Sequence, residues 1–205
     1  DDDYEDISDL FGGAVAIDGD YIIVGAHNHD YDTGGYRSGT QWNAGAAYIF
    51  ERSAGVWSET QKLLNHDRYA WDRFGYAVDI DSSTIVVGVW SEDESEFDGA
   101  ELKNAGSAYI FTRDIGGVWN EVQKLDASDR TTGDHFGIDV GIDGDYIVFG
   151  AEQEDLDADG SDDLSNAGAA YIFQRDEAGV WAEINKIVQS DRAVEDRFGE
   201  GVAIS

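Results

Sequence analysis

The chain of 205 residues contains no cysteine, no proline and no methionine. The absence of cysteine excludes a disulfide framework and thiol chemistry. Without proline, turns must be formed by Gly, Asp, Asn and Ser, and 25 glycines are present to supply them. Because even an initiating methionine is missing, we expect a mature or excised piece of a longer protein. No apolar run approaches the length of a membrane-spanning helix, so we expect no membrane insertion.

Positive charge is also scarce in this sequence. Lys and Arg total 13 against 44 Asp and Glu, which gives a formal net charge of -31. Such a chain would be repelled by nucleic acid and by anionic membranes, so neither is an expected partner. The charge suits calcium, a cationic partner, or a solvated acidic surface with no specific role. Hydrophobic residues still make up 41% of the chain, which is enough to form a core.

The sequence repeats itself with a period of about 62 residues. Phe-Gly pairs begin at Phe11, Phe74, Phe136 and Phe198, spaced by 63, 62 and 62 residues. The same period carries "NAGAAYIF" or "NAGSAYIF" segments and "GVW" segments. A fixed period of this size indicates a solenoid, a propeller or an array. We therefore divide the single domain 1–205 into repeats 9–71, 72–133 and 134–195 and a partial repeat 196–205.

Each repeat predicts four short β-strands, which in the first repeat are 14–17, 21–26, 46–50 and 57–63. These segments are rich in Val, Ile, Tyr, Phe and Trp and are bounded by turn residues. Asp18-Gly19 and Asp143-Gly144 are tight hairpin signals between the first two strands. Four antiparallel strands in about 60 residues are typical of a β-propeller blade. The predicted fold is therefore all-β, with three full blades and the first strand of a fourth.

The repeat resembles the FG-GAP repeat, the blade of integrin α-subunit propellers and of many bacterial surface proteins. The Phe-Gly pairs carry the resemblance, together with "VGA" at 24–26 and "FGA" at 149–151. In the family a Pro follows Gly-Ala, but this sequence has His27, Trp90 and Glu152 at that position. The second repeat also has Val89 in place of the Ala. The resemblance implies a seven-bladed propeller in a secreted or cell-surface prokaryotic protein. Three blades would then be a fragment of a longer propeller, and the alternative is that copies associate.

Strand alternation in a propeller blade predicts where the variable loops emerge. The loops between the second and third strands and the connections between blades must share one face. The turns on the opposite face are short and repetitive, whereas the loops 27–42, 90–103 and 152–165 are long and differ from one another. Variable loops on a repetitive scaffold are where binding is expected, so this face is the predicted site of function.

The loop "DLDADGSDD" at 155–163 is the best candidate metal site. Carboxylates occupy its first, third, fifth and ninth positions, and Gly160 allows a sharp turn. The seventh position can supply a backbone carbonyl, and this set of oxygen donors suits Ca²⁺. The pattern resembles the calcium loops of FG-GAP domains, although those of integrins lie between the first and second strands. The alternative is a solvated acidic loop. The predicted ligands are Asp155, Asp157, Asp159, Ser161 and Asp163, with weaker sets at Asp30 and Asp32 and at Asp93, Ser95 and Glu101.

Several aromatic side chains that do not recur with the period belong to the same face. Trp57, Trp119 and Trp181 recur in every repeat and are therefore expected to pack within the blades. The aromatic residues without counterparts could form a patch for a glycan or a protein partner, and the alternative is that they anchor the loops. These candidate partner-binding residues are Trp42, Trp71, Trp90 and Tyr36.

Histidine and the recurring charged residues give weaker signals. His27, His29 and His66 also belong to this face, but a zinc site would lack a fourth ligand. An Asp two residues before each Phe-Gly pair and an Asp-Arg pair in each connection recur in every blade. Such recurrence indicates turn hydrogen bonds and ion pairs between blades rather than a site.

The sequence shows no catalytic constellation, since nucleophile elbows and phosphate-binding glycine loops are absent. We therefore expect a non-catalytic, extracellular binding or adhesion module with Ca²⁺ rigidifying its acidic loops. One alternative is a structural subunit whose copies assemble into an array or fibre. Another is a glycan-acting hydrolase, which would need two carboxylates facing each other across a pocket.

Overall fold

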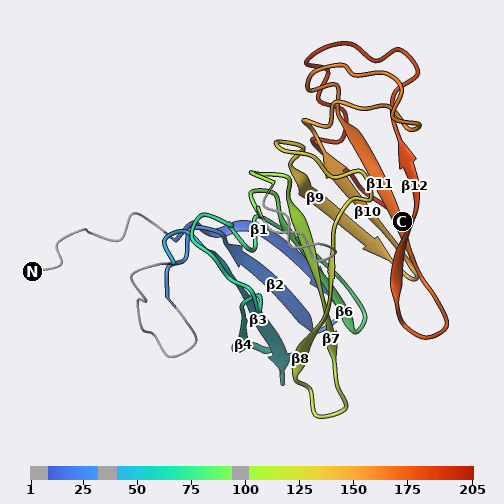
Figure 1. Cartoon of the computed structure of the whole chain (residues 1–205). Coiled ribbons are helices and arrows are strands. Elements are labelled where there is room, and N and C mark those ends of the chain that lie inside the picture. The colour runs from blue at the N-terminus through green and yellow to red at the C-terminus, as the bar shows by residue number, and fades with distance from the viewer. Residues whose placement is uncertain (1–8, 32–40, 94–101) are drawn as a thin grey trace, which may run out of the picture.

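The computed structural model describes residues 9–31, 41–93 and 102–205. Within these ranges the chain folds into three antiparallel sheets of four strands each, which Figure 1 shows side by side in an open row. Strands neighbour one another in chain order within each sheet, as in propeller blades. Among the described residues, no helix is long and apolar enough to cross a membrane.

The strand bounds agree with the predicted repeat. The first sheet consists of β1 (Phe11–Asp18), β2 (Tyr21–Ala26), β3 (Ala46–Ser53) and β4 (Val56–Leu63). The second consists of β5 (Ala77–Asp81), β6 (Thr84–Val89), β7 (Ser107–Arg113) and β8 (Trp119–Leu125). The third consists of β9 (Phe136–Asp143), β10 (Tyr146–Ala151), β11 (Ala169–Arg175) and β12 (Trp181–Ile187).

The hydrophobic cores lie between adjacent sheets. Phe74 and Tyr109 of the second blade pack with Ile23 and Ile49 of the first, and Phe136 and its neighbours form the same kind of core between the second and third blades. Trp119 and Trp181 are 3% and 2% exposed, so the prediction that they serve the packing of the blades is confirmed. Trp57 is half-buried because no described sheet precedes its own.

Backbone contact between glycines joins each blade to the next. Gly75 belongs to the Phe-Gly pair at the start of the second blade and adopts φ +85°. Its carbonyl oxygen faces Gly25, and a Cβ placed on Gly25 would lie 2.0 Å from that oxygen. Gly45 forms a parallel bridge with Phe74, and a Cβ on Gly45 would lie 2.1 Å from the Phe74 oxygen. Glycine is needed at these positions because any side chain would push the sheets apart.

The partial fourth repeat docks on the third blade in the same way. Phe198 forms the parallel bridge with Gly168, and a Cβ on Gly150 would lie 1.9 Å from the Gly199 oxygen. Residues 200–205 do not form the predicted strand. The reason is physical, since no second strand of that blade is described with which they could pair. The Val202 N–H donates to the Asp139 Oδ2 at 2.8 Å and ties them to β9.

The tight junction predicts a large effect of one methyl group. Gly88 of β6 has no positive φ, but a Cβ at this position would lie 2.1 Å from the Gly137 oxygen. We expect Gly88→Ala to lower the free energy of unfolding by about 1–3 kcal/mol, the range for overpacking, in denaturant titrations. Gly141→Ala in β9 is the matched control, because its nearest contact is an ordinary 3.4 Å. Equal effects of the two substitutions would contradict this account of the junction.

Candidate functional site: the loop face

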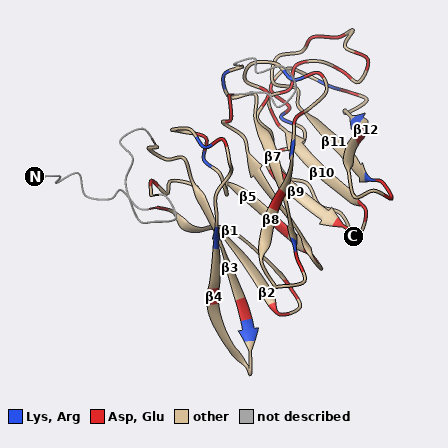
Figure 2. Ribbon diagram, turned by 60° about the horizontal axis from the view of Figure 1, so that its bottom comes forward, with Lys and Arg blue, Asp and Glu red and all other residues tan. Residues whose placement is uncertain are grey.

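The predicted common face of the variable loops and the blade connections is confirmed by hydrogen bonds between them. The Trp71 N–H donates to the Trp42 oxygen at 2.7 Å in the first blade. The equivalent bonds, from Gly133 to Lys103 and from Glu195 to Ser165, are both 2.9 Å. We call the surface formed by the described loop residues 27–31, 41–45, 90–93, 102–106 and 152–168 and by the connections 64–73, 126–135 and 188–197 the loop face. Figure 2 shows many of its acidic segments in red around the β9–β12 sheet.

The recurring Asp-Arg pairs of the connections hold neighbouring blades together. Asp67 accepts hydrogen bonds from the Tyr109 hydroxyl at 2.6 Å and from the Lys124 Nζ at 2.7 Å, both in the second blade. Arg68 points the other way and donates to the backbone oxygen of His29 at 2.8 Å, in the first blade. The prediction that these pairs are structural is therefore confirmed.

A buried lysine lies at the centre of each of these contacts. The Lys124 side chain is 1% exposed, and its Nζ lies 3.5 Å from the Glu92 Oε1 in addition to its bond with Asp67. The third blade repeats the cluster around Lys186, which lies 2.6 Å from Asp129 and 3.2 Å from Glu154. Such buried charges are stable only as complete networks, so these conspicuous polar groups serve the fold.

The aspartates that precede the second and third Phe-Gly pairs by two residues are also buried. Asp72 accepts the backbone N–H of Tyr69, and Asp134 accepts that of Thr131, so the predicted turn hydrogen bonds are confirmed. Burial raises the pKa of Asp72 to about 8, with a further contribution from the negative charge of Glu92. Burial and Glu154 raise the pKa of Asp134 to about 7.

The three candidate zinc ligands have separate partners. His29 takes the place that Glu92 has in the second blade, with its Nε2 2.5 Å from the Lys62 Nζ and its Nδ1 2.9 Å from Asp9. His66 binds the Glu121 carboxylate at 2.5 Å, while the His27 ring lies 5.0 Å from the Tyr76 ring. Across the described ranges, no group of three or more His, Cys, Asp or Glu is arranged to hold a metal ion. The structure therefore does not form the zinc site.

The acidic loop 155–163 is organised by its own hydrogen bonds. Asp157 Oδ1 accepts the Ser161 N–H at 2.8 Å, and Asp159 Oδ1 accepts the same N–H at 3.0 Å, so these two carboxylates converge. Ser161 Oγ also donates to Asp157, at 3.1 Å. The hydrogen bond from the Ser161 N–H is the main cause that lowers the pKa of Asp157 to about 2. The loop is thus a compact turn that keeps Asp157 ionised.

The remaining predicted calcium ligands are placed differently. Asp155 Oδ1 accepts the Asn166 N–H at 2.7 Å at the base of the loop, and the equivalent bonds from Asp30 to Asn43 and from Asp93 to Asn104 are 2.6 and 2.7 Å. The first acid of each loop therefore closes the loop in every blade. As described, the five predicted ligands do not form a shell of the six to eight oxygens that Ca²⁺ takes. Four predicted residues lie outside the described ranges: Asp32, Tyr36, Ser95 and Glu101.

Two of the predicted partner-binding tryptophans are neighbours on the loop face. Trp42 is 40% exposed and Trp71 is 57% exposed, and the backbone hydrogen bond described above joins them. Trp71 has φ +77° at the position where the next repeat has Gly133, with φ +92°. A left-handed conformation costs a residue with a bulky side chain about 1–2 kcal/mol, whereas glycine adopts it freely. Trp71 is therefore strained and exposed at the same time.

The third predicted tryptophan, Trp90, directly follows β6 and packs against residues that flank the second and third Phe-Gly pairs. Its ring lies 4.4 Å from the His135 ring and 5.8 Å from the Tyr76 ring, with the Arg73 guanidinium 4.9 Å from its centre. These residues come from the first strands and their flanks, where the blades meet. The sequence did not predict this gathering, because the residues are far apart in the chain and none of them forms a motif.

Comparisons with known proteins agree with the fold. A family model described as the FG-GAP repeat matches residues 5–50, 57–111 and 119–173. Among 93 matching chains of solved structures is a crystal structure from Bacteroides fragilis named as a candidate 6-phosphogluconolactonase. It is 14% identical with a TM-score of 0.50, and the match covers 87% of this chain but 39% of that one, so the likeness concerns the fold alone. No curated protein matches the chain.

The buried aspartates predict a specific pH dependence of stability. Asp72 and Asp134 are protonated in the folded protein below pH values of about 8 and about 7, whereas in the unfolded chain they ionise near 3.8. Folding therefore takes up protons between these limits, and the stabilisation that the protonated carboxyls provide is lost as the pH rises through the folded-state pKa.

We compare the free energy of unfolding of the wild type with that of Asp72→Asn at each pH. We expect the wild-type value to decrease relative to the variant as the pH rises from 5 to 8, by at most about 1.4 kcal/mol per pH unit. Denaturant titrations at several pH values measure this difference. Asp114→Asn is the control, because Asp114 is exposed and hydrogen bonds from Val118 and its neighbours hold its pKa below the usual value. A wild-type curve parallel to that of Asp72→Asn would contradict the assignment.

Proposed function

Because the chain belongs to the FG-GAP repeat family, we propose that it is a non-catalytic binding module that contacts its partner through the loop face. The recurring residues and the variable residues of the repeats lie in different places, and this separation supports the role. The polar groups that recur in all blades, such as Asp67 and Lys124, are used in the contacts between sheets. The residues that differ between blades gather on one face of a rigid scaffold, where a partner can reach them.

The strained and exposed Trp71 is the observation that carries the proposal. Its left-handed backbone is held by the Trp42 oxygen and by the Ser91 hydroxyl, which donates to the Trp71 oxygen at 2.7 Å. Tyr69, 54% exposed, lies two residues away. The left-handed backbone recurs at Gly133 and Glu195 in the other two connections, so it belongs to the scaffold. Exposed aromatic surface reduces solubility, and binding explains best why the scaffold presents it here. Aromatic rings of this kind suit a glycan ring or a protein surface.

We also propose that the module functions outside a prokaryotic cell and that Ca²⁺ binds the loop 155–163. The spacing of the acids in the sequence and the convergence of Asp157 and Asp159 support the calcium proposal. The present arrangement of the loop is held by hydrogen bonds and lacks a full set of ligands, so calcium would have to rearrange it. The role proposed for the ion is to stiffen the loop next to the partner-binding surface.

Self-assembly is a second candidate role that one observation favours. Val15 and Ile17 of β1 are 65% and 63% exposed, whereas the equivalent Val78 and Ile80 of β5 are 8% and 5% exposed because the first blade covers them. The outer face of β1 is therefore the same apolar surface that the blade junctions bury. A further blade, from the same parent chain or from another copy, would fit it.

The binding proposal predicts a variant that loses function without losing stability. Trp71→Gly relieves the backbone strain but adds flexibility to the unfolded chain, so we expect the free energy of unfolding to stay within about 1 kcal/mol of the wild type. On arrays of glycans and of extracellular proteins, we expect the ligands of the wild type to be lost in Trp71→Gly. Tyr146→Ala is the control, because Tyr146 is also an exposed ring, at 42%, and it lies on the opposite face. An unchanged array pattern in Trp71→Gly, or no ligand for the wild type, would argue against the proposal.

The calcium proposal is tested by thermal unfolding with and without Ca²⁺. We expect Ca²⁺ to raise the Tm of the wild type and to leave the Tm of Asp157→Ala/Asp159→Ala unchanged, because binding to the folded state alone stabilises it. Asp114→Ala is the matched control, since Asp114 accepts backbone N–H groups of Gly116 and Val118 in a similar turn. If the double variant keeps the full rise in Tm, Ca²⁺ does not bind at this loop.

A further inference from the structure

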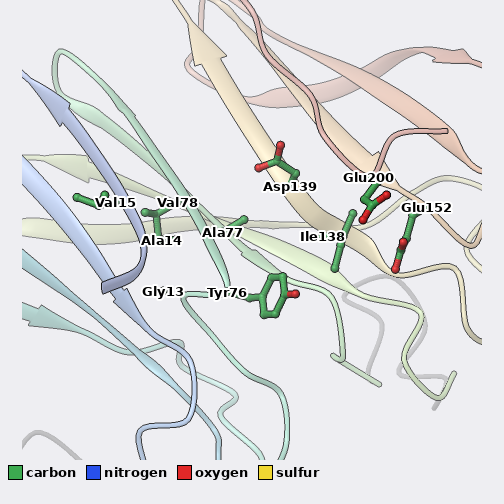
Figure 3. Close-up of a pocket in the computed structure, with 10 residues that line it drawn as sticks. All are labelled: Gly13, Ala14, Val15, Tyr76, Ala77, Val78, Ile138, Asp139, Glu152 and Glu200. Atoms are coloured by element: carbon green, nitrogen blue, oxygen red, sulfur yellow. The ribbon is translucent and has the colours of Figure 1, made fainter. Parts of the chain in front are cut away.

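The row of three blades exposes the two halves of a blade junction at its two ends. At one end, Val15 and Ile17 of β1 are exposed, whereas Val78 of β5 is buried in the core between the first two blades. Figure 3 shows Val15 on β1 and Val78 on β5, at equivalent positions of the two blades. At the other end, Ile187 of β12 is 37% exposed, while its counterpart Leu63 in β4 is 2% exposed. Each end therefore carries apolar surface that a complete junction buries.

These two surfaces are the sides of the first and the third blade that are turned away from the second blade. Because the blades repeat, each residue on them has counterparts whose contacts are seen at the two junctions within the chain. We call the side of the first blade the leading face, which includes Val15, Ile17, Trp57, Glu59 and Lys62. We call the side of the third blade the trailing face, which includes Asn185, Ile187, Ser190 and Asp191.

At both junctions within the chain, a glutamine of one blade binds the backbone of the next blade. The Gln61 Nε2 donates to the Trp119 oxygen at 2.7 Å, and the Gln61 Oε1 accepts the Trp119 N–H at 2.9 Å. Gln123 forms the same two bonds with Trp181, at 2.8 and 2.9 Å. A third pair of this kind would join the trailing face to a leading face, where the residues at these positions are Asn185 and Trp57.

The connection after each blade supplies two further polar contacts of the junction. Glu183 of the third blade accepts the Ser128 N–H at 2.8 Å, and the Lys186 Nζ lies 2.6 Å from Asp129. The first junction has the corresponding pairs Glu121–His66 and Lys124–Asp67. On the trailing face the connection presents Ser190 and Asp191, both exposed, and on the leading face the positions of the two partners hold Glu59 and Lys62. Each polar contact of a junction is thus divided between the two ends of the row.

We propose that the leading face of one copy of this chain docks on the trailing face of a second copy and extends the row by the contacts that join its own blades. A second copy supplies a partner for each of these polar groups, whereas an unrelated apolar surface would bury them unpaired. Head-to-tail contact leaves one face open on each copy, so association continues until a ring closes or a filament grows. The proposal rests on the self-assembly role proposed above and is independent of the loop face.

Residues 196–205 cover part of the trailing face and must move when a second copy docks. Phe198 and Gly199 contact Gly168 and Gly150, in the place that Phe11 and the glycine after it would take in the second copy. Figure 3 shows Glu200 of this segment near Glu152, which directly follows β10. Residues 200–205 form no strand, whereas β1 pairs with β2 from Phe11 to Asp18. The segment is therefore displaced at a lower cost than β1, and it acts as a placeholder on the trailing face.

Sedimentation velocity over a range of protein concentrations tests the proposal, in about 0.5 M NaCl to screen the repulsion between copies with net charge -31. We expect species of two or more copies, and we expect Ile17→Lys to weaken their association by about tenfold or more, because it buries a charge in the apolar junction. Ile184→Lys is the matched control, since Ile184 is 53% exposed and its counterpart Val122 stays 52% exposed in a blade with both junctions complete. A wild type that remains monomeric, or equal effects of the two substitutions, would overturn the proposal.

The absence of cysteine allows a direct test of which surfaces meet. Glu59→Cys and Ser190→Cys place one thiol on the leading face and one on the trailing face. A short bismaleimide cross-linker should join the two variants when they are mixed and should join neither variant to itself, because a head-to-tail contact never pairs the same position of two copies. If copies associate but Glu59→Cys links only to itself, self-assembly stands and this interface is wrong. If no copies associate, both proposals fail.

Two substitutions should strengthen the association. Asn185→Gln gives the trailing face the amide length of Gln61 and Gln123, and we expect it to raise the affinity about fivefold, the effect of one net hydrogen bond of about 1 kcal/mol. Phe198→Ala loosens the placeholder and should also raise the affinity, so weaker association of this variant would contradict the displacement of residues 196–205. Trp71→Gly should associate as the wild type does, which keeps this test separate from that of the loop face.

Discussion

The structure depends on the contact of bare backbone between neighbouring blades. Gly25 and Gly75 meet with no room for a side chain, and Gly88 with Gly137 and Gly150 with Gly199 repeat the contact. This approach seats Phe74 or Phe136 in the core between two sheets and aligns one blade with the next. Because a methyl group would separate the sheets, the Phe-Gly pairs and the glycines at 25, 88 and 150 recur in every blade.

Once the junction is fixed, charge has two distinct uses. Around Lys124 and Lys186, acids of two blades are buried and bonded to one cation, so they behave as part of the core. On the loop face, acids such as Asp157 and Asp159 stay accessible. The excess of negative charge in the composition therefore combines structural carboxylates with available ones, and burial separates the two classes.

The sequence predicts the blades well, because periodicity and Asp-Gly turns are local signals that the packing does not override. The strands β2, β6 and β10 begin and end as the repeat indicates. The sites were harder to predict. The spacing of Asp155 in the sequence predicts a metal ligand, but in the structure its carboxylate accepts the Asn166 N–H and closes the loop. This role depends on the path of the folded backbone and cannot be predicted from the spacing. His29 could not be recognised as the counterpart of Glu92 without knowing that both face a buried lysine.

The uncovered face of β1 has a consequence for how the molecule loses its structure. Each sheet is stabilised by its neighbours alone, so the free energy of the row is a sum of terms for the blades and for the interfaces between them. Among the described blades the second has an interface on both sides and the first has one, so wherever β1 stays uncovered the first blade opens at a lower free-energy cost than the second. Hydrogen exchange in such a row would be graded along the chain, with the strands β5, β6 and β7 opening last.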